Sequence, residues 1–567
     1  MGRFNLLEEP WIVVIVNDKG RTEKVSLVEF FKNAHKYRAL AGEMVTQDFA
    51  VYRLLLAVLH TVFSRFNSKG EPYKWIDLDD RYVQKEAVDE DDVDDYKEAL
   101  SETWKNLWGS KEFPNIVVEY LEKWRDRFYL FDEKYPFYQV TEEEATSRLA
   151  EDKSPGTTSG KNINRLISES GNKIALFSPK DDNGKEKNKE RMELDELVRW
   201  LITLQGYFGL ADKTIFGSSK YKASKGWLFD LGGVLLEGDN AFETLLLNMV
   251  INTKDEDSLD LIQAPCWEYS GAENIEKRFI SSVITNKAEL YTNWSRACYI
   301  DPTTEDGDIV SINVIKLPEL EHKNQRIEPM TVWRFNEKGE NKNFNTPKKH
   351  NAEQAMWRSF GMIALPDDPK VKQMRPGIMS WYREIRSFIH KGGEDRILAI
   401  KAISMQDDGN ATSWVPTDEI LDTLYMDDLV VTDDENAGWV YRITEVVNET
   451  KTVIENTYKS FLKDIDEIRK PAGKFVAERV EDAYQSVDLP FRLWLEGIIY
   501  SDNKEKKVAE WKNRLRSLIV KQADSIMEEG GSRDYIGIEA KTGIKNIATA
   551  YNRFLVTLNR GWLKGGR

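Results

Sequence analysis

A chain of 567 residues is far longer than a usual single domain, so we expect two or more domains. Hydrophobic residues make up 41% and aromatic residues 11% of the chain, which is enough for a sizeable core and excludes a largely disordered protein. The net charge of −16 argues mildly against a protein that coats nucleic acid. A local basic groove stays compatible with that charge, because binding depends on where the charges cluster.

The chain contains two cysteines, Cys266 and Cys298, which are too few for a disulfide framework or a four-thiolate zinc site. We expect both to be small core residues in a reducing cytoplasm. The N-terminus lacks the apolar segment of a signal peptide, and no run of about 18 apolar residues is present. These patterns predict a cytoplasmic protein without a membrane span.

The N-terminal part of the chain mixes helical and strand patterns. The first long helix is predicted from Gln47 to about Arg65, where apolar residues recur every three or four positions and indicate one buried face. Residues 151–193 lack such periodicity, and we interpret about 167–192 as a long, flexible, basic loop. A helix from Glu193 to Gln205 leads into a glycine-containing loop. Aromatic and β-branched runs between turns then predict a mixed α/β body.

The C-terminal part changes character after about residue 415, where four long helical stretches each carry one apolar stripe. Helix breakers separate them at Pro471–Gly473, Ser501–Asn503 and Gly530–Ser532. Amphipathic helices joined by short loops favour an antiparallel four-helix bundle. We therefore predict an α+β protein, with a large mixed α/β domain over 1–412 and a C-terminal four-helix bundle over 413–567.

Motifs for several kinds of catalysis are missing from the sequence. None of the five histidines lies in an HxH, HD or HExxH arrangement, which argues against a nuclease built on histidine-bound metal. The sequence also lacks a GxxxxGK[ST] phosphate loop and a GxSxG nucleophile elbow. Together these absences favour binding over catalysis, so we expect a non-enzyme with no metal and no cofactor.

Several segments resemble one known family. The opening Phe4–Ile12, with the sequence FNLLEEPWI, is similar to the F-N-L-L-x-x-P-W-I start of the large subunit (CasA family) of the type I-E CRISPR Cascade complex. Further similar segments follow in the order that this family has them, and they cover nearly the whole chain. They are Val25–Leu27, Phe128–Phe131 with Pro136–Gln139, Gln263–Trp267, Leu290–Arg296 and Glu328–Met330.

The resemblance implies a non-catalytic DNA-recognition subunit. In that family the large subunit lies near the 5′ handle of the CRISPR RNA, beside other Cascade subunits. It recognises the protospacer-adjacent motif in double-stranded DNA, helps to open the duplex for pairing with the guide RNA, and recruits a helicase–nuclease for antiviral defence. The family's C-terminal domain is a four-helix bundle, as the periodicity here also predicts.

The resemblance also implies candidate residues that contact the motif. The family's glycine loop corresponds to Gly206–Gly217, with Gly209, Lys213 and Gly217 as candidates. A helix C-cap followed by a purely structural turn stays an alternative for this loop. The family's lysine that enters the minor groove corresponds most nearly to Lys316, for which a solvated surface lysine is the alternative.

The family's DNA wedge corresponds to Met405–Thr412, with Gln406, Gly409 and Asn410 as candidate residues. Asp407 and Asp408 lie beside them and would be repelled by phosphate, so we expect the tip to point between the strands or to stand off. An ordinary hairpin turn is the alternative, because Asp-Gly is also a common turn signal.

The predicted basic loop corresponds to the family's flexible loop that docks near the RNA handle. Its aromatic and cationic residues suit stacking and phosphate contacts, although a solvated linker is an alternative. Some family members carry zinc-binding CxxC pairs near this loop, but this sequence has none, so zinc is not expected. The candidate docking residues are Phe177, Lys180, Lys185, Lys187 and Lys189.

Two other function classes stay open at this stage. One is an unrelated enzyme with a helical C-terminal domain, which the missing motifs disfavour. The other is a purely structural protein scaffold without direct DNA contact, which the net charge of −16 slightly favours.

Overall fold

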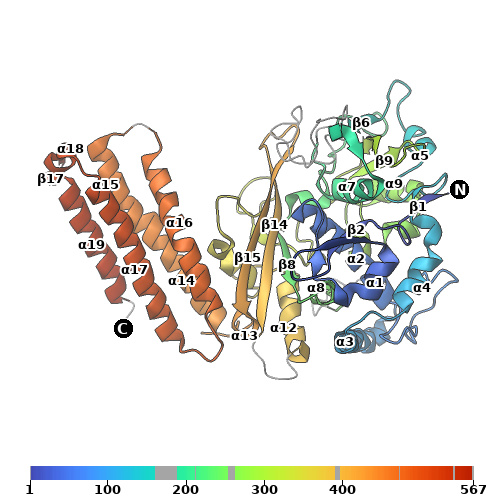
Figure 1. Ribbon diagram of the computed structural model, residues 1–567, viewed down its shortest axis with the longest axis horizontal. Helices are drawn as coiled ribbons and strands as arrows, with labels where there is room; N and C mark the ends of the chain where they lie inside the picture. Colours follow the sequence, from blue (N-terminus) through green and yellow to red (C-terminus); the bar gives the residue numbers. More distant parts are fainter. Residues whose placement is uncertain are drawn as a thin grey trace. The chain divides into compact units, whose positions relative to one another are not determined.

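The computed structural model describes residues 2–159, 188–210, 212–252, 262–389, 396–471, 473–540 and 543–564 (Figure 1). The chain forms two units that are discontinuous in sequence. The first contains residues 1–352, 368–391 and 400–423, and the second contains residues 353–367, 392–399 and 424–567. The mixture of helices and sheets expected from the sequence is confirmed. The division predicted between residues 412 and 413 stays a prediction.

Helix α2 (Val45–Phe63) lies at the centre of the first unit. It contacts α4 (Ile116–Lys123), α7 (Leu194–Tyr207), α8 (Ala241–Asn248) and α10 (Lys287–Tyr291). The sequence predicts that only one face of this helix is buried. In the structure all its residues except Val45 and Asp48 are buried, so the prediction understates the burial. Arg53 is the buried cation of this helix, and its guanidinium donates to both carboxylate oxygens of Glu328, at 2.9 and 2.7 Å. A helix surrounded by other helices needs such a partner wherever it carries a charge.

The other helices of the first unit differ in burial: every residue of α8 (Ala241–Asn248) is buried, whereas α3 (Val93–Ser110) and α9 (Gly271–Ile280) bury only part of their surface. Side chains of Ser26, Thr141, Asn240, Ser270 and Asn286 cap five of them, because each accepts a hydrogen bond from a backbone N–H of the first turn. These helices and their neighbours are α1 (Leu27–Asn33), α3 (Val93–Ser110), α4 (Ile116–Lys123), α5 (Glu142–Thr146), α7 (Leu194–Tyr207), α8 (Ala241–Asn248), α9 (Gly271–Ile280), α10 (Lys287–Tyr291) and α12 (Gly377–Ile389).

The strands of the first unit form small sheets. One has the order β3-β2-β4 (Thr22–Val25, Ile12–Ile15, Ala39–Leu40), and a second has the order β6-β11-β9 (Gly156–Ser159, Ser311–Lys316, Arg296–Ile300). The antiparallel register of the second sheet places Lys316 opposite Arg296. Smaller pairs are β1 (Arg3–Asn5) with β5 (Tyr129–Phe131), β7 (Arg191–Met192) with β10 (Asp308–Ile309), and β12 (Trp333–Phe335) with β13 (Asn345–Pro347).

A third sheet has the order β15-β14-β8 (Pro416–Asp427, Ile397–Asp407, Gly233–Glu237). Strand β15 lies inside the range that was predicted for the helical bundle. The first helix after this strand is α13 (Asp428–Val431). The connection between β14 and β15, residues 408–415, is a turn of the first unit.

The second unit consists mainly of long helices (Figure 1). The four predicted helical stretches are α14 (Trp439–Thr452) continued by a π-helical segment (Val453–Tyr458) and α15 (Lys459–Arg469), then α16 (Phe475–Glu496), α17 (Lys504–Glu528) and α19 (Ile547–Lys564). Helix α17 packs on α14, α16 and α19, and α15 packs on α16 and α19. Short elements α18 (Ser532–Ile536), β16 (Ile538–Ala540) and β17 (Gly543–Lys545) link the last two long helices.

The segment 353–367 also belongs to this unit, although the main stretch of the unit begins only at residue 424. It includes α11 (Phe360–Ala364), which packs on α14. Trp357 is fully buried and stacks on Phe491 of α16, with ring centroids 4.3 Å apart. Phe491 in turn meets Trp511 of α17 edge to face at 4.9 Å. This aromatic cluster joins three separate stretches of sequence into one core.

No helix in the described part of the chain is long and apolar enough to cross a membrane. Both cysteines are buried free thiols, and burial raises the pKa of Cys266 to about 12. A thiol held protonated in this way is unreactive, in keeping with a core role.

Candidate nucleic-acid interface

The glycine loop begins where α7 ends. Gly209 has a φ of +77°, a conformation that residues with a side chain rarely adopt. A Cβ atom at this position would lie 2.3 Å from the carbonyl oxygen of Trp414, closer than any real contact. The loop therefore needs glycine here for two reasons, backbone conformation and close approach.

Hydrogen bonds join this loop to the turn at 408–415. The N–H of Leu210 donates to the carbonyl oxygen of Ser413 at 2.7 Å, and the N–H of Gly209 donates to that of Lys225 at 2.9 Å. The turn is closed by the N–H of Trp414, which donates to the carbonyl oxygen of Asn410 at 2.8 Å. Two segments that are about two hundred residues apart in sequence thus form one continuous backbone surface.

Lys316, the last residue of β11, brings the third predicted segment to the same place. Its N–H donates to the carbonyl oxygen of Thr214 at 3.0 Å, and its Nζ donates to that of Leu210 at 3.3 Å. Burial lowers the pKa of the ammonium, and the carboxylate of Asp212 opposes this shift. Lys316 is half-buried and holds the loop in this structure, so it is neither a fully solvated lysine nor one that extends from the surface.

The sequence patterns did not predict a role for Arg296, whose buried side chain binds the inner side of the glycine loop. Its guanidinium is completely buried and donates to the carbonyl oxygens of Gly209 and Ser224, both at 2.6 Å. It also pairs with Asp212, Nη2 to Oδ1 at 2.8 Å, and lies 4.6 Å from the centroid of the Phe208 ring. Arg296 is the last residue of the Leu290–Arg296 match, and this position was the available sign of its importance. The neighbouring sequence does not indicate that it contacts the glycine loop.

The remaining glycine-loop candidates, Lys213 and Gly217, are both exposed. Gly217 has a φ of +64° and open space around its missing side chain, and its N–H donates to the carbonyl oxygen of Arg148 at 3.0 Å. Lys213 lies between Asp212, which is anchored to Arg296, and Thr214, which is anchored to Lys316. A fixed backbone therefore carries an exposed cation at this point.

The wedge candidates are all exposed: Gln406 lies near the end of strand β14, and Gly409 and Asn410 lie on the turn that follows. Gly409 has a φ of +68° with nothing around its Cβ position. The side-chain oxygen of Asn410 accepts from the N–H and the hydroxyl of Thr412, at 3.1 and 2.7 Å. Asn410 therefore stabilises the turn in this structure. This local role is the one expected of an ordinary hairpin turn.

The two neighbouring acids are engaged within the protein. Asp407 pairs with Lys349, Oδ2 to Nζ at 2.6 Å. Asp408 accepts from the N–H groups of Asn410 and Val415, at 3.0 and 3.2 Å. Lys349 therefore offsets the charge of Asp407, whereas the partners of Asp408 are uncharged groups that do not remove its repulsion of phosphate.

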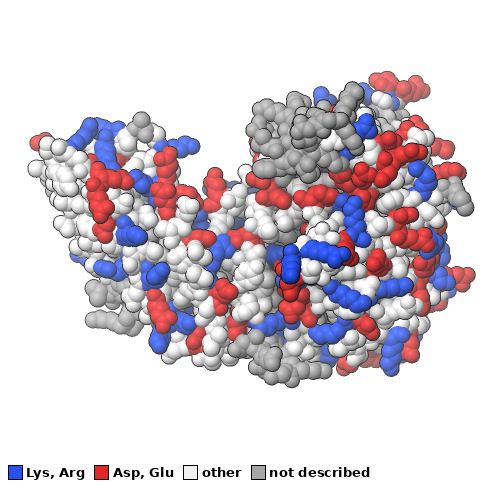
Figure 2. Space-filling view, in the orientation of Figure 1, with Lys and Arg blue, Asp and Glu red and all other residues white. Residues whose placement is uncertain are grey.

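The predicted docking loop falls largely outside the described residues, and this applies to Phe177, Lys180, Lys185 and Lys187. The backbone of Lys189 belongs to a 3₁₀ turn, Asn188–Glu190. Within the described part of the chain, no group of three or more His, Cys, Asp or Glu residues could hold a metal ion. Figure 2 shows Lys and Arg interspersed with Asp and Glu over the face in view, so charges of both signs share this surface.

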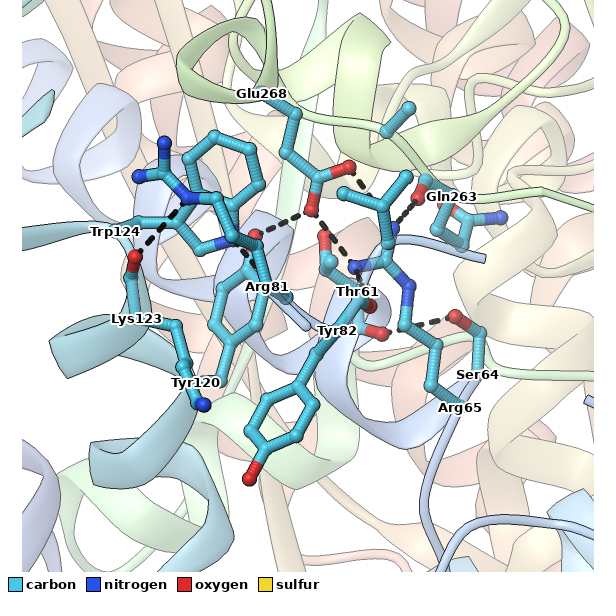
Figure 3. Close-up of polar contacts among 12 residues, drawn as sticks. Thr61, Ser64, Arg65, Arg81, Tyr82, Tyr120, Lys123, Trp124, Gln263 and Glu268 are labelled. Carbon is cyan, nitrogen blue, oxygen red and sulfur yellow. Dashed lines mark hydrogen bonds and ion pairs between the residues drawn. The ribbon is translucent and has the colours of Figure 1, made fainter. Parts of the chain in front are cut away.

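The Gln263–Trp267 match lies in a buried polar network instead of a surface site (Figure 3). Arg65 is fully buried and pairs with Glu268 at 2.8 Å, while its Nη2 donates to the carbonyl oxygen of Gln263 at 2.6 Å. The hydroxyl of Tyr120 donates to the same carboxylate at 2.8 Å. Because every partner is internal, this motif stabilises the fold.

Comparisons with known proteins agree with this architecture. The family model of the CRISPR-associated protein Cse1 matches residues 5–522. CRISPR-associated protein CasA/Cse1 of Thermus thermophilus is 27% identical over 381 residues, which are 65% of this chain. The match spans 62% of that relative's length. The chain belongs to the Cse1 family of CRISPR-associated proteins, which is also called CasA.

Solved structures show the same fold over nearly the whole chain. Cse1 of Thermobifida fusca has a TM-score of 0.75 at 21% identity, and the match covers 98% of this chain and 97% of that one. CasA of Thermus thermophilus has a TM-score of 0.67 at 18% identity and covers 98% and 100%. A chain of a CRISPR RNA-guided surveillance complex has a TM-score of 0.68 at 15% identity, again covering 98% and 100%.

Proposed function

We propose that this chain is the non-catalytic large subunit of a CRISPR RNA-guided surveillance complex, in which it recognises the protospacer-adjacent motif of double-stranded DNA. Family membership supports the assignment, as does the structural likeness to a chain of such a complex. Its partners would be the other subunits, the 5′ handle of the CRISPR RNA, the target duplex and a helicase–nuclease. It would help to open the duplex and would then recruit that enzyme.

The observation that carries the proposal is the meeting of the glycine loop, the 408–415 turn and the half-buried Lys316, next to which Lys213, Gly409 and Asn410 are exposed. Minor-groove patterns are degenerate, so a reader that needs only a short motif can work there with backbone and a few cations. The groove's negative potential attracts a lysine such as Lys213. A turn that is held rigidly beside this contact suits a wedge between base steps. The guide RNA would read the rest of the target.

The helices of the second unit have a separate role in this proposal. We propose that they form the antiparallel four-helix bundle expected from the sequence and that they serve as a docking surface for protein partners. Many cations of this unit are paired on its surface, for example Lys512 with Glu449 at 2.8 Å. A surface of balanced charge favours protein contacts over general contact with phosphate.

The test is target binding by a complex reconstituted with and without this chain, using duplexes that carry or lack a candidate motif. Salt is fixed at about 0.1 M, because phosphate contacts make the affinity salt-dependent. We expect motif-dependent binding to require the chain and to weaken with Lys213→Ala. The matched control is Lys338→Ala, which removes another exposed lysine, from the connection between β12 and β13. Equal binding with and without the chain would reject the proposal, and motif binding that Lys213→Ala leaves unchanged would favour a scaffold.

A further inference from the structure

The central helix α2 begins without a cap of its own. Met44 is its N-cap residue, and the side chain of Met44 accepts no hydrogen bond from the first turn. The backbone N–H groups of a first turn have no partners within the helix and need acceptors from elsewhere. Thr46 and Gln47 are fully buried, so solvent has little access to this turn. Another part of the chain must therefore supply the acceptors.

Glu419, near the beginning of strand β15, supplies these acceptors. Its Oε1 accepts from the N–H of Val45 at 3.3 Å, and its Oε2 accepts from the N–H of Thr46 at 3.0 Å. The hydroxyl of Thr46 donates to the same Oε2 at 2.9 Å. A carboxylate at the positive end of a helix gains from the helix dipole as well as from the hydrogen bonds. One side chain of β15 thus caps a helix that begins 374 residues earlier in the sequence.

The acidic residues that lie closer in sequence have other partners. Glu43 pairs with Arg199 of α7, Oε1 to Nη2 at 2.5 Å. The carboxyl group of Asp48 accepts from the N–H of Gly42 at 2.8 Å. Within the described part of the chain, Glu419 is therefore the acidic side chain that caps this helix.

The place of Glu419 in its sheet connects this cap to the 408–415 turn. In the order β15-β14-β8, strand β15 lies at the edge, and among the described strands it pairs only with β14. Glu419 follows Trp414 by five residues, so even a fully extended chain spans at most about 18 Å between them. The outer edge of β15 is therefore bonded to the core helix at a point close to the turn.

Trp414 is the residue of the turn that depends most on such support. Its φ is +46°, a left-handed conformation that a bulky residue adopts only where its surroundings hold it. Its carbonyl oxygen lies against Gly209, and the carbonyl oxygen of Ser413 accepts from the N–H of Leu210 at 2.7 Å. A displacement of β15 would move these two carbonyl groups away from the glycine loop.

We propose that Glu419 is a positioning residue for motif recognition. By capping α2 it fixes the edge strand β15, and through Trp414 and Ser413 it holds the 408–415 turn against the glycine loop. Glu419 does not contact DNA in this mechanism. The inference rests on the proposed function, because the glycine loop and the turn are the segments that would meet the duplex.

The test variant is Glu419→Ala in the full chain. Glu419→Gln is the conservative variant, because it keeps a side-chain oxygen that can accept from the helix. The matched control is Asn240→Ala, which removes the cap of α8 in the same unit, where the side chain of Asn240 accepts from the N–H of Glu243 at 2.9 Å. Both alanine variants lose one helix cap, and thermal unfolding shows whether they are destabilised alike.

Two measurements separate positioning from stability. Hydrogen exchange of residues 408–416 needs no DNA, and we expect it to accelerate in Glu419→Ala but not in Asn240→Ala. The second is the ratio of affinities of the reconstituted complex for duplexes with and without the motif, at about 0.1 M salt. We expect Glu419→Ala to lower this ratio about tenfold, within the range seen when a residue away from a ligand alters its binding. Glu419→Gln should retain most of the ratio, and Asn240→Ala should leave it unchanged.

Equal acceleration of exchange in Glu419→Ala and Asn240→Ala would overturn the proposal, and so would an unchanged affinity ratio in Glu419→Ala. Glu419 would then contribute to stability alone. If Glu419→Ala does not fold, Thr46→Val takes its place, because it removes the 2.9 Å contact with Glu419 and keeps the shape of the side chain. Unchanged exchange of the turn in Thr46→Val would overturn the proposal in that case.

Failure of this inference is separable from failure of the proposed function. If the wild type binds both duplexes equally, the proposed function fails, whereas exchange of the turn still decides whether Glu419 holds it. If the wild type discriminates and Lys213→Ala weakens this discrimination, while Glu419→Ala leaves it intact, only the positioning role is rejected.

Discussion

The guanidinium of Arg296 donates a hydrogen bond of 2.6 Å to the carbonyl oxygen of Gly209, and so connects the β6-β11-β9 sheet to the first turn of the glycine loop. The same side chain pairs with Asp212 three residues later. One buried cation thus fixes two points of a loop that has little regular structure of its own. The loop's exposed face is preorganised because its inner face is bonded to the sheet.

Removing this cation tests its role in positioning the loop. Arg296→Ala leaves the Asp212 carboxylate and two carbonyl oxygens without their buried partner, and such losses cost about 3–5 kcal/mol. Arg296→Lys keeps the charge but cannot reach all these acceptors, so we expect an intermediate loss. Hydrogen exchange of residues 208–216 should accelerate in both variants, more in Arg296→Ala. Unchanged exchange in that segment would show that the loop does not depend on Arg296.

The two glycines of the loop differ in their surroundings, and this difference predicts different costs. Alanine at either position incurs the penalty of a positive φ, about 1–2 kcal/mol. Only Gly209→Ala also meets a backbone oxygen, that of Trp414. We expect Gly209→Ala to lower both the unfolding temperature and motif-dependent DNA binding, and Gly217→Ala to have the smaller effect on stability. Equal effects on the unfolding temperature would contradict the close approach.

Substitutions of Asn410 separate its role in the turn from a role at DNA. Asn410→Asp keeps the oxygen that accepts from Thr412, whereas Asn410→Ala removes it, at a cost of about 1 kcal/mol. We therefore expect Asn410→Asp to fold like the wild type but to bind duplex more weakly, because it adds a negative charge at the exposed tip. Thermal unfolding and duplex binding measured on both variants check this. If Asn410→Asp binds duplex normally, the tip does not approach phosphate.

The carboxyl group of Asp48 gives a prediction of pH dependence. Burial raises its pKa to about 7; a hydrogen bond from the N–H of Gly42 opposes the rise, and Glu43 and Glu419 add to it. The folded protein therefore binds a proton that the unfolded chain has released above about pH 4. Folding stability should decline as pH rises from about 4 to 7 and then level off, with a total loss of up to about 4 kcal/mol.

Asp48→Asn removes this titration and keeps a side-chain oxygen that can accept from Gly42. We expect its unfolding temperature to exceed that of the wild type at pH 8 and to match it near pH 4. The measurement is thermal unfolding of both proteins over this range. Parallel pH profiles would show that Asp48 titrates normally.

The sequence by itself determined the helices of the second unit and the family. Apolar residues at three- and four-residue spacing predicted four helical stretches, which are α14 with α15, α16, α17 and α19, and the breakers near 471, 502 and 531 fall between them. The terminal FNLLEEPWI match lies at the start of the region that the family model covers. Both signals are local: each is complete within a few tens of residues, so no knowledge of spatial neighbours is needed.

Only the tertiary structure decided which distant segments meet. Helix α2 has the sequence pattern of a helix with one buried face, yet other helices surround it. Its Arg53 pairs with Glu328, which lies 275 residues away in the sequence. The β6-β11-β9 sheet places Arg296 and Lys316 side by side next to the glycine loop. The backbone N–H of Leu210 donates a hydrogen bond to the carbonyl oxygen of Ser413. The periodicity of apolar residues indicates which face of an element is buried. It does not indicate which other element packs against that face. The candidate interface consists of such partners, so its residues could be nominated from the sequence, while their assembly, and the part played by Arg296, depended on the fold.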